Sequence, residues 1–185
     1  MRIVVGVTGA SGAPLALRLL QNLMNQEVHL VISKNAWEVI KLELGEGVSF
    51  PCSYSYRDDD FSAPLASSSF IIDAMVVIPC SMKTLAAIAH GYADNLITRA
   101  AENALKLGKP LILVPRETPL SLVDIDNMRK AKRAGAIILP AMVAYYHKPR
   151  SVDDITDFIV GKVLDILGIE HKLYARWGEI KPPPS

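Results

Sequence analysis

The chain alternates between short, continuous apolar runs and longer segments in which apolar residues recur at helical spacing. The runs share a richness in Val, Ile and Leu and cover residues 2–7, 28–33, 74–79, 110–115 and 136–140. A continuous apolar run of this length is typical of a parallel strand that is buried on both faces. The intervening helices are predicted at residues 13–24, 34–45, 82–108, 121–134 and 151–167. This order predicts an α/β fold, a single-domain, Rossmann-like, doubly wound parallel sheet covered by helices.

The ends of these elements carry local signals of their own. Ser151 is a helix N-cap candidate because its hydroxyl accepts from free N–H groups, and the acids at 153 and 154 favour the positive end of the helix dipole. Gly168 is a candidate stop, and Gly91 is expected to break the segment 82–108 into two helices. Residues 46–73 are polar and predicted to be irregular. We therefore expect one domain over residues 1–168 and a C-terminal tail over 169–185.

Composition narrows the class of protein further. The chain has 185 residues, 20 basic and 19 acidic side chains and a net charge of +1, which predicts neither a nucleic-acid partner nor a membrane partner. Cys52 and Cys80 form no disulfide framework and no CxxC spacing, as is usual in a reducing compartment. The chain starts directly with a strand-like segment, and no apolar run reaches the roughly 18 residues that span a bilayer. We expect a cytoplasmic protein.

A glycine-rich segment follows the first predicted strand, at the edge of the sheet where ligands of such folds bind. Gly6, Gly9 and Gly12 give GxxGxxG rather than GxGxxG, and the chain lacks GxxxxGK[ST], so a dinucleotide site and a P-loop are disfavoured. The N–H groups of the turn and the Ser11 hydroxyl suit a phosphate monoester. Other hydroxyls expected at neighbouring strand ends are those of Ser33, Ser81 and Thr84. The alternative is a tight strand-to-helix turn without a ligand.

Two side chains in these loops are candidate nucleophiles. Ser11 lacks the GxSxG pattern of a nucleophile elbow, because glycine follows it directly, so acyl transfer is disfavoured. Cys80 precedes a predicted helix, where a thiolate is favoured, but a packed small residue is the simpler interpretation.

The sequence offers little support for a metal site. Asp58, Asp59 and Asp60 are adjacent in a polar segment and point in different directions, so they are expected to form a solvated loop. The four histidines, at positions 29, 90, 147 and 171, show no metal-ligand spacing.

Charged and aromatic residues gather after the fourth and fifth predicted strands. Arg116 and Glu117 follow the fourth strand at the ligand edge, either as site residues or as a surface ion pair. The segment 145–150, YYHKPR, is either a platform beside a second anion or a partly exposed apolar rim. Arg99 and Lys106 share one face of a predicted helix, although Lys106 is also placed to pair with Glu102, four residues earlier.

Seven segments in order resemble the UbiX-type flavin prenyltransferases, in the flavoprotein decarboxylase-like fold group. They are VTGASGA, ISK, PCSMKTLAAIAHGYADNLITRAAENALK, PLILVPRETPLS, GAIILPA, YYHKP and RWGE, and they span nearly the whole chain. The resemblance implies a flavodoxin- or flavoprotein-decarboxylase-type sheet. It also implies a metal-independent enzyme that transfers the prenyl group of dimethylallyl monophosphate to N5 and C6 of reduced FMN. The product, prenylated FMN, would serve UbiD-type decarboxylases, and the protein would be a homo-oligomer, a dodecamer, with sites at subunit interfaces.

The resemblance also implies roles for individual residues. Those expected to contact FMN are Gly9, Ala10, Ser11, Ser33, Ser81, Met82, Lys83, Thr84 and Arg116. Those expected to hold the dimethylallyl phosphate are Lys106, Tyr146 and Lys162, with Arg99 and Ser67. Glu117 and Ser11 would assist proton transfer near N5, and no metal ligand is implied. Two departures bear on the substrate: Lys162 stands where the family commonly has arginine, and Phe61 where some members have tryptophan.

Two other functions share the FMN loop. A direct FMN-dependent decarboxylase of this fold group relies on a histidine early in the chain, whereas His29 lies inside the second predicted strand. A flavin carrier or decarboxylase subunit would need no Glu117 and no second set of phosphate ligands. The flavin prenyltransferase is therefore the preferred hypothesis. The choice between a monophosphate and a diphosphate donor stays open.

Overall fold

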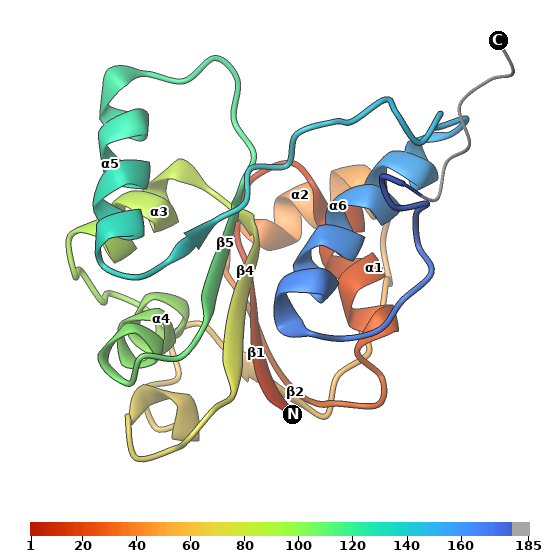
Figure 1. Cartoon of the computed structure of the whole chain (residues 1–185). Coiled ribbons are helices and arrows are strands. Elements are labelled where there is room, and N and C mark those ends of the chain that lie inside the picture. Colours follow the sequence, from red (N-terminus) through yellow and green to blue (C-terminus); the bar gives the residue numbers. More distant parts are fainter. Residues whose placement is uncertain (179–185) are drawn as a thin grey trace, which may run out of the picture.

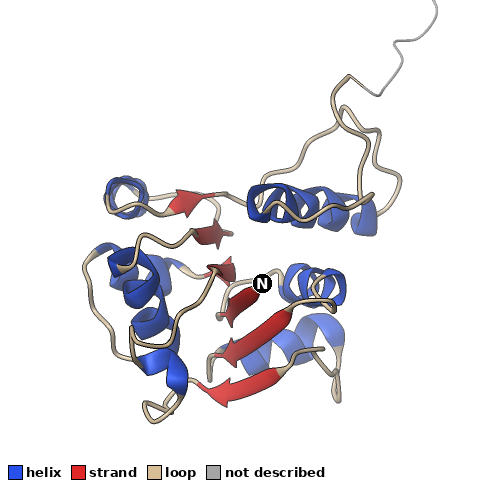
Figure 2. Ribbon diagram, turned by 60° about the horizontal axis from the view of Figure 1, so that its bottom comes forward, coloured by secondary structure: helices blue, strands red, loops and turns tan. Residues whose placement is uncertain are grey.

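The computed structural model describes residues 1–178, which form one six-stranded parallel sheet (Figures 1 and 2). The strands are β1 (Arg2–Val7), β2 (Glu27–Ile32), β3 (Tyr54–Arg57), β4 (Ala74–Cys80), β5 (Leu111–Pro115) and β6 (Ile137–Ile138). Their order across the sheet is β3-β2-β1-β4-β5-β6. The chain winds outward from β1 to β3 and then returns to β4 on the other side of β1. The order therefore reverses between β1 and β4, where the loops that follow the two strands lie side by side.

Helices cover both faces of the sheet (Figure 2). They are α1 (Ala13–Asn22), α2 (Ala36–Leu44), η1 (Pro64–Ala66), α3 (Met82–Ala89), α4 (Leu96–Lys106), α5 (Leu122–Arg133) and α6 (Val152–Leu167). One core lies between the sheet and the layer of α1, α2 and α6, and a second between the sheet and the layer that contains α3, α4 and η1, with α5 packed against α3. The predicted doubly wound α/β fold is confirmed.

The apolar runs become central strands because both of their faces are buried. In β1, Ile3 and Val5 enter the core under α1, while Val4 enters the core under α4. In β4, Met75 and Val77 join Val4. Burial of such a side chain stabilises the fold by about 1.5–3 kcal/mol, so the central strands are fixed in register by their own composition.

Most predicted boundaries agree with the structure. The segment 82–108 divides into α3 and α4 around Gly91, which has a φ of 67°. Ser151 caps α6 by accepting from the Asp154 amide, and Gly168 ends α6 in the left-handed region, with a φ of 70°. The last predicted strand is shorter than expected: β6 contains only Ile137 and Ile138, both half-buried at the sheet edge.

The prediction that residues 46–73 are irregular is wrong. This segment contains β3, which pairs in parallel with β2, and η1, which packs against α4. The sequence of β3, Tyr-Ser-Tyr-Arg, lacks the apolar run of the other strands because β3 is an edge strand with mostly exposed side chains. Its pairing with β2 therefore comes from backbone hydrogen bonds that the side-chain pattern does not reveal.

The predicted C-terminal tail is described only as far as residue 178, and residues 179–185 lie outside the described residues. The division between a domain over 1–168 and a tail over 169–185 stays a prediction. Among the described helices, none is both long and apolar enough to cross a membrane.

Candidate functional site

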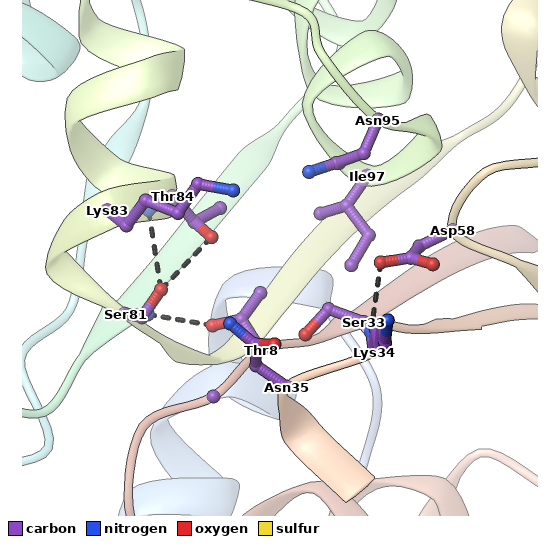
Figure 3. A pocket seen from close by; sticks show the side chains of 11 residues that line it. Thr8, Ser33, Lys34, Asn35, Asp58, Ser81, Lys83, Thr84, Asn95 and Ile97 are labelled. Carbon is purple, nitrogen blue, oxygen red and sulfur yellow. Dashed lines mark hydrogen bonds between the residues drawn. The ribbon is translucent and has the colours of Figure 1, made fainter.

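A polar cavity of about 270 Å³ opens at the switch point, where β1, β2 and β4 end (Figure 3). Its lining comes from five different segments: Thr8, Gly9, Ser33, Lys34, Asn35, Asp58, Ser81, Lys83, Thr84, Asn95 and Ile97. We call it the switch-point cavity. It brings together five of the residues predicted to contact FMN, namely Gly9, Ser33, Ser81, Lys83 and Thr84.

The start of α3 forms one wall of the switch-point cavity. The Ser81 hydroxyl caps α3 by accepting from the Thr84 amide at 3.3 Å, and it donates to the Thr84 hydroxyl at 3.1 Å. Thr8 fixes this turn from below, because its hydroxyl accepts from the Ser81 amide at 2.7 Å and donates to the Pro79 carbonyl at 2.8 Å. Within residues 1–178, the first-turn amides of α3 at positions 82 and 83 have no protein acceptor. They and the helix dipole favour an anion.

The start of α1 is different, because a carboxylate already occupies it. Glu43, in the last turn of α2, accepts from the Gly12 amide at 2.9 Å and from the Ala13 amide at 2.8 Å. Gly9, in contrast, lets the loop approach β2: a Cβ there would lie 3.2 Å from the Asn35 Cβ. In a single chain the glycine-rich loop therefore lines the cavity, while these two α1 amides are not free for a phosphate. No local signal in the sequence pointed to Glu43, because it lies thirty-one residues from Gly12.

Sequence reasoning missed six lining residues: Thr8, Lys34, Asn35, Asp58, Asn95 and Ile97. Thr8, Lys34 and Asn35 directly follow strand ends, which was a usable signal. Asp58 lies in a loop, as predicted, but it is half-buried and also lines this cavity. Its carboxylate accepts from the Lys34 amide at 2.9 Å, and its carbonyl accepts from the Leu96 amide at 2.7 Å. Asp58 follows β3, so missing that strand also hid its role.

Arg116 and Glu117 follow β5, beside the glycine-rich loop. The Arg116 guanidinium donates through Nε to the Ser11 carbonyl at 3.3 Å, which joins the loops after β1 and β5. The Glu117 carboxylate is exposed and accepts only from the adjacent Thr118 amide, at 3.0 Å, among the described residues. The two side chains form no ion pair with each other in the described chain, so the surface-pair alternative is wrong. A second cavity of about 380 Å³ lies beside them, lined also by Leu120, Met128, Pro140 and Met142.

The candidate phosphate ligands on the α4 side are already paired. Lys106 and Arg99 both contact Glu102, at 2.7 and 2.9 Å, and Arg99 also donates to the Ala66 carbonyl at 3.0 Å. The hydrogen bond from Lys106, and then that from Arg99, lower the pKa of Glu102. Ser67 is exposed nearby, and its hydroxyl accepts from the Ser69 amide. The structure confirms the alternative interpretation, in which Lys106 forms an ion pair with Glu102.

Position along α4 separates Lys106 from the switch-point cavity. Asn95, the N-cap of α4, lines the cavity, and α4 has 11 residues. At 1.5 Å per residue, Lys106 lies about 15 Å further along the helix. A single chain therefore does not bring Lys106 to the edge where Gly9 and Thr84 lie.

On the other face of the sheet, Tyr146 and Lys162 meet in a group of rings. We call Tyr146, His147, Phe158, Tyr174 and Trp177 the α6 aromatic cluster. The Lys162 Nζ lies 5.4 Å from the Phe158 ring centre and 4.8 Å from that of Tyr174, and it has no acidic partner within residues 1–178. The Tyr146 ring packs edge-on against Phe158, at 5.8 Å, and Trp177, at 5.2 Å. Both predicted phosphate ligands of this side therefore contact Phe158.

Asp165 of α6 holds the C-terminal segment against the helix. Its carboxylate accepts from the Tyr174 hydroxyl at 2.5 Å, contacts His171 Nε2 at 3.0 Å and accepts from Arg176 at 2.7 Å. Burial acts to raise the pKa of Asp165, but these hydrogen bonds outweigh burial and lower it. Gly161 makes room, because a Cβ there would lie 2.6 Å from the Tyr174 ring. The segment thus places the Tyr174 ring beneath Lys162.

The structure also shows the surroundings of Cys80 and His29. Cys80 is fully buried, and burial raises the pKa of its thiol to about 12, so it is a packed residue rather than a reactive thiolate. His29 lies inside β2, as predicted, where its nitrogens contact the Tyr56 hydroxyl at 3.0 Å and Glu27 at 2.9 Å. The described residues contain no group of three or more His, Cys, Asp or Glu side chains placed to hold a metal ion.

A parallel sheet with a polar cavity at its switch point and a free helix N-terminus defines the class of α/β proteins that bind a mononucleotide phosphate. The Flavoprotein family matches residues 1–164 of this chain. The flavin prenyltransferase UbiX of Thermoplasma acidophilum is 48% identical over 180 residues, which cover 96% of this chain and 100% of that protein. The chain belongs to the Flavoprotein family and, within it, to the UbiX-type flavin prenyltransferases, as the seven motifs predicted.

Two solved structures are similar over nearly their full length. The dodecameric FMN-dependent UbiX-like decarboxylase from Escherichia coli O157:H7 superposes with a TM-score of 0.90, at 45% identity, covering 96% of this chain and 99% of that one. AnUbiX (PadA1), solved in complex with FMN and dimethylallyl pyrophosphate, superposes with a TM-score of 0.88, at 43% identity, covering 95% and 96%. Both superpositions cover 95% or more of this chain.

Proposed function

We propose that this protein is a flavin prenyltransferase that joins the dimethylallyl group of dimethylallyl monophosphate to N5 and C6 of reduced FMN. It releases prenylated FMN, which serves UbiD-type decarboxylases, and phosphate. One observation carries the proposal: a protein 43% identical over 95% of this chain binds both FMN and dimethylallyl pyrophosphate. Cys52 and Cys80 are both free thiols, as is usual in a reducing compartment, which supports a cytoplasmic enzyme.

The switch-point cavity is proposed to hold the FMN phosphate. Ser33 and Thr84 offer hydroxyls, and the α3 amides of Met82 and Lys83 offer unpartnered N–H donors within the described chain. The Lys83 ammonium lies 3.4 Å from Asp94, a long contact that a phosphate can replace. The flavin would then extend along Gly9, Ala10 and Ser11 toward Arg116, which contacts the Ser11 carbonyl.

Tyr146 and Lys162 are proposed to hold the phosphate of the allylic substrate. As the allylic C–O bond breaks, the leaving phosphate gains negative charge, which ammonium and hydroxyl donors stabilise without a metal. The Lys162 ammonium is suited to this because aromatic faces, rather than a carboxylate, surround it in the described chain. A lysine supplies the charge of the usual arginine but not its two parallel donors.

Glu117, with Ser11, is proposed to move protons. Bond formation at N5 and at C6 each releases one proton from reduced FMN. One of the two protons is taken up by the alkene carbon of the allyl chain and the other by the departing phosphate, so the reaction is balanced. The exposed Glu117 carboxylate, which accepts only from its neighbouring amide among the described residues, is free to carry these protons.

The complete site is proposed to need a second copy of the chain. Tyr146 and Lys162 lie on the α6 side of the sheet, whereas Ser67, Arg99 and Lys106 lie on the α4 side. A neighbouring subunit can bring the α4 side of one copy to the α6 side of another. The E. coli relative is dodecameric, and apolar side chains exposed on this chain, including Leu122 and Tyr145, would be buried in such an assembly.

The direct test is anaerobic incubation of the protein with reduced FMN and either dimethylallyl monophosphate or dimethylallyl diphosphate, followed by mass spectrometry of the flavin. We expect a mass gain of one C5 unit with loss of the donor phosphate, and faster turnover with the monophosphate. A flavin of unchanged mass with both donors would contradict the proposal. Release of CO₂ from aromatic or cysteinyl acids would then indicate a decarboxylase, and bound but unmodified FMN a carrier.

A mixing experiment tests the composite site. Lys106→Ala and Lys162→Ala oligomers are dissociated, mixed in equal amounts and reassembled. If the two lysines come from different copies, about one site in four receives both wild-type side chains, because each contribution is drawn at random from two variants. If both came from one copy, every site would lack one lysine and mixing would restore nothing. Reassembled wild-type protein controls for losses during the exchange.

A further inference from the structure

His147 is the one described residue whose side-chain nitrogens are both buried and without a hydrogen-bond partner. A neutral imidazole carries one N–H donor and one acceptor, and burial of either without a partner is unfavourable. Native proteins rarely keep such a group, so its presence calls for an explanation.

The surroundings of His147 connect it to the proposed phosphate ligands. Its ring stacks on Phe158, with centres 4.9 Å apart and planes 7° apart, and meets the edge of Tyr146 at 5.6 Å. Phe158 carries the Lys162 ammonium 5.4 Å from its centre. His147 and Lys162 therefore both contact Phe158, and His147 contacts Tyr146 directly.

The backbone holds this arrangement in a tight turn. Lys148 donates its amide to the Tyr145 carbonyl at 2.9 Å and has a φ of 54°. That region is costly for a residue with a Cβ, so the turn persists because its contacts over-determine it. The turn presents Tyr146 and His147 to α6 together, so a change at one ring acts on the other.

The charges that face His147 come from the same loop and from α6. Asp154 interacts electrostatically with His147, but its carboxylate already accepts from the Arg150 amide at 2.6 Å and from the Ser151 amide at 3.1 Å. Lys162 and Tyr174 contact the Phe158 ring on which His147 stacks, and Lys148 and Arg150 follow His147 in the chain. Asp154 is thus committed to the start of α6, while the Lys162 ammonium contacts the same ring on which His147 stacks.

We propose that His147 is a positioning residue of the allylic-phosphate site, which takes up a proton when the phosphate binds at Tyr146 and Lys162 and gives it up when the phosphate leaves. This inference rests on the proposed function of these two ligands. An anion at that position offsets the Lys162 charge and attracts a protonated imidazole, so binding of the anion and protonation of His147 favour each other by the same factor. The protonated ring then fixes Tyr146 and adds positive charge behind it.

The test uses 3-methylbutyl sulfate, a saturated analogue that cannot react and that stays fully ionised between pH 6 and 8. Calorimetric titration of the FMN-loaded oligomer in buffers of different ionisation enthalpy counts the protons taken up per ligand bound. We expect net proton uptake near pH 7, and an affinity that rises about tenfold from pH 8 to pH 6. FMN fills the other anion site, and the sulfate probe contributes no protons of its own.

Substitutions of His147 test whether this residue takes up the proton. His147→Gln retains a donor but does not titrate, so it should bind the sulfate with no proton uptake and with little dependence on pH. His147→Phe, which retains the stack on Phe158, checks that result if the glutamine variant folds poorly. His90→Gln is the matched control, because His90 is the C-cap of α3, in the layer on the other face of the sheet, and should behave as the wild type.

Two results would overturn the inference while leaving the proposed function intact: no proton uptake by the wild type, or unchanged uptake by His147→Gln. Failure of the proposed phosphate site itself gives a different result, in which Lys162→Ala binds 3-methylbutyl sulfate as tightly as the wild type. Both readouts depend on binding alone and require no turnover.

Discussion

Similar cations have different partners on the two sides of the sheet. On the α4 side, Lys106 and Arg99 share the carboxylate of Glu102. On the α6 side, Lys162 lies over the rings of Phe158 and Tyr174, with no acidic partner in the described chain. An ammonium that faces aromatic rings keeps its N–H donors available, whereas one bound to a carboxylate has already used part of its charge. The same residue types therefore support local structure on one side and form the proposed phosphate site on the other.

The acids show the same contrast. Glu102 accepts from two cations, which lower its pKa, whereas Glu117 is exposed and accepts from a single backbone amide among the described residues. A carboxylate with two cationic partners is a poor proton acceptor. Glu117 is free to act as one, so the distinction between committed and uncommitted charges predicts which substitutions affect catalysis.

The largest expected effect is that of Glu117→Gln. The amide keeps the shape of the side chain but cannot take up a proton, so turnover should fall about 10²- to 10⁴-fold while FMN still binds. Glu102→Gln is the matched control and should leave the proton-transfer step nearly unchanged. Anaerobic stopped-flow absorbance measures both. Normal prenylation by a Glu117→Gln variant that binds FMN would remove this residue from the mechanism.

The cations provide the next comparison. Lys162→Ala should raise the KM for dimethylallyl monophosphate roughly tenfold to a hundredfold, because a hydrogen bond to a charged group is lost, while FMN affinity stays the same. Lys106→Ala should raise the KM less, by about threefold to tenfold, because Glu102 already offsets its charge. Steady-state kinetics at saturating reduced FMN measure both. A larger effect at Lys106 would reverse the contrast between the two sides.

A smaller effect is expected for a neutral group in the switch-point cavity. Thr84→Val removes a buried hydroxyl that accepts from Ser81, and FMN affinity should fall about twofold to tenfold. Thr156→Val is the control, because its hydroxyl donates to the Val152 carbonyl within α6 and faces no part of this cavity. Flavin fluorescence titration compares the two variants. Equal FMN affinities would place the phosphate away from Thr84.

The smallest effect is expected for Glu27, an acid that is already paired and lies at the edge of the sheet where the strands begin. Hydrogen bonds from Arg2, at 2.7 Å, and from His29 lower the pKa of Glu27 from 4.5 to about 2. Because the folded-state pKa is depressed, the stabilisation is complete above pH 4.5 and is lost as the pH falls toward 2. The melting temperature of wild-type protein should fall slightly more over this range than that of Glu27→Gln. Parallel curves would show that this pair contributes nothing to stability.

Much of the site could be predicted because it follows strand ends. Ser33, Ser81 and Thr84 were expected at one edge, and the structure brings them into one cavity, since parallel strands end together. Asp58 could not be placed, because β3 carries no apolar run and pairs through its backbone. Glu43 could not be found either, because its contact with the start of α1 joins two helices far apart in the sequence.

By itself, the sequence determined the order of the α-helices and of every strand except β3, the two helix caps of α6 and the family, because apolar periodicity, capping residues and motifs are local properties of the chain. Only the tertiary structure decided which charges are free. Whether Lys106 or Lys162 keeps its donors depends on the acids and rings that the fold brings to it, such as Glu102 and Phe158. Those distances arise from packing of distant segments, and electrostatic interactions depend on distance and burial rather than on residue type.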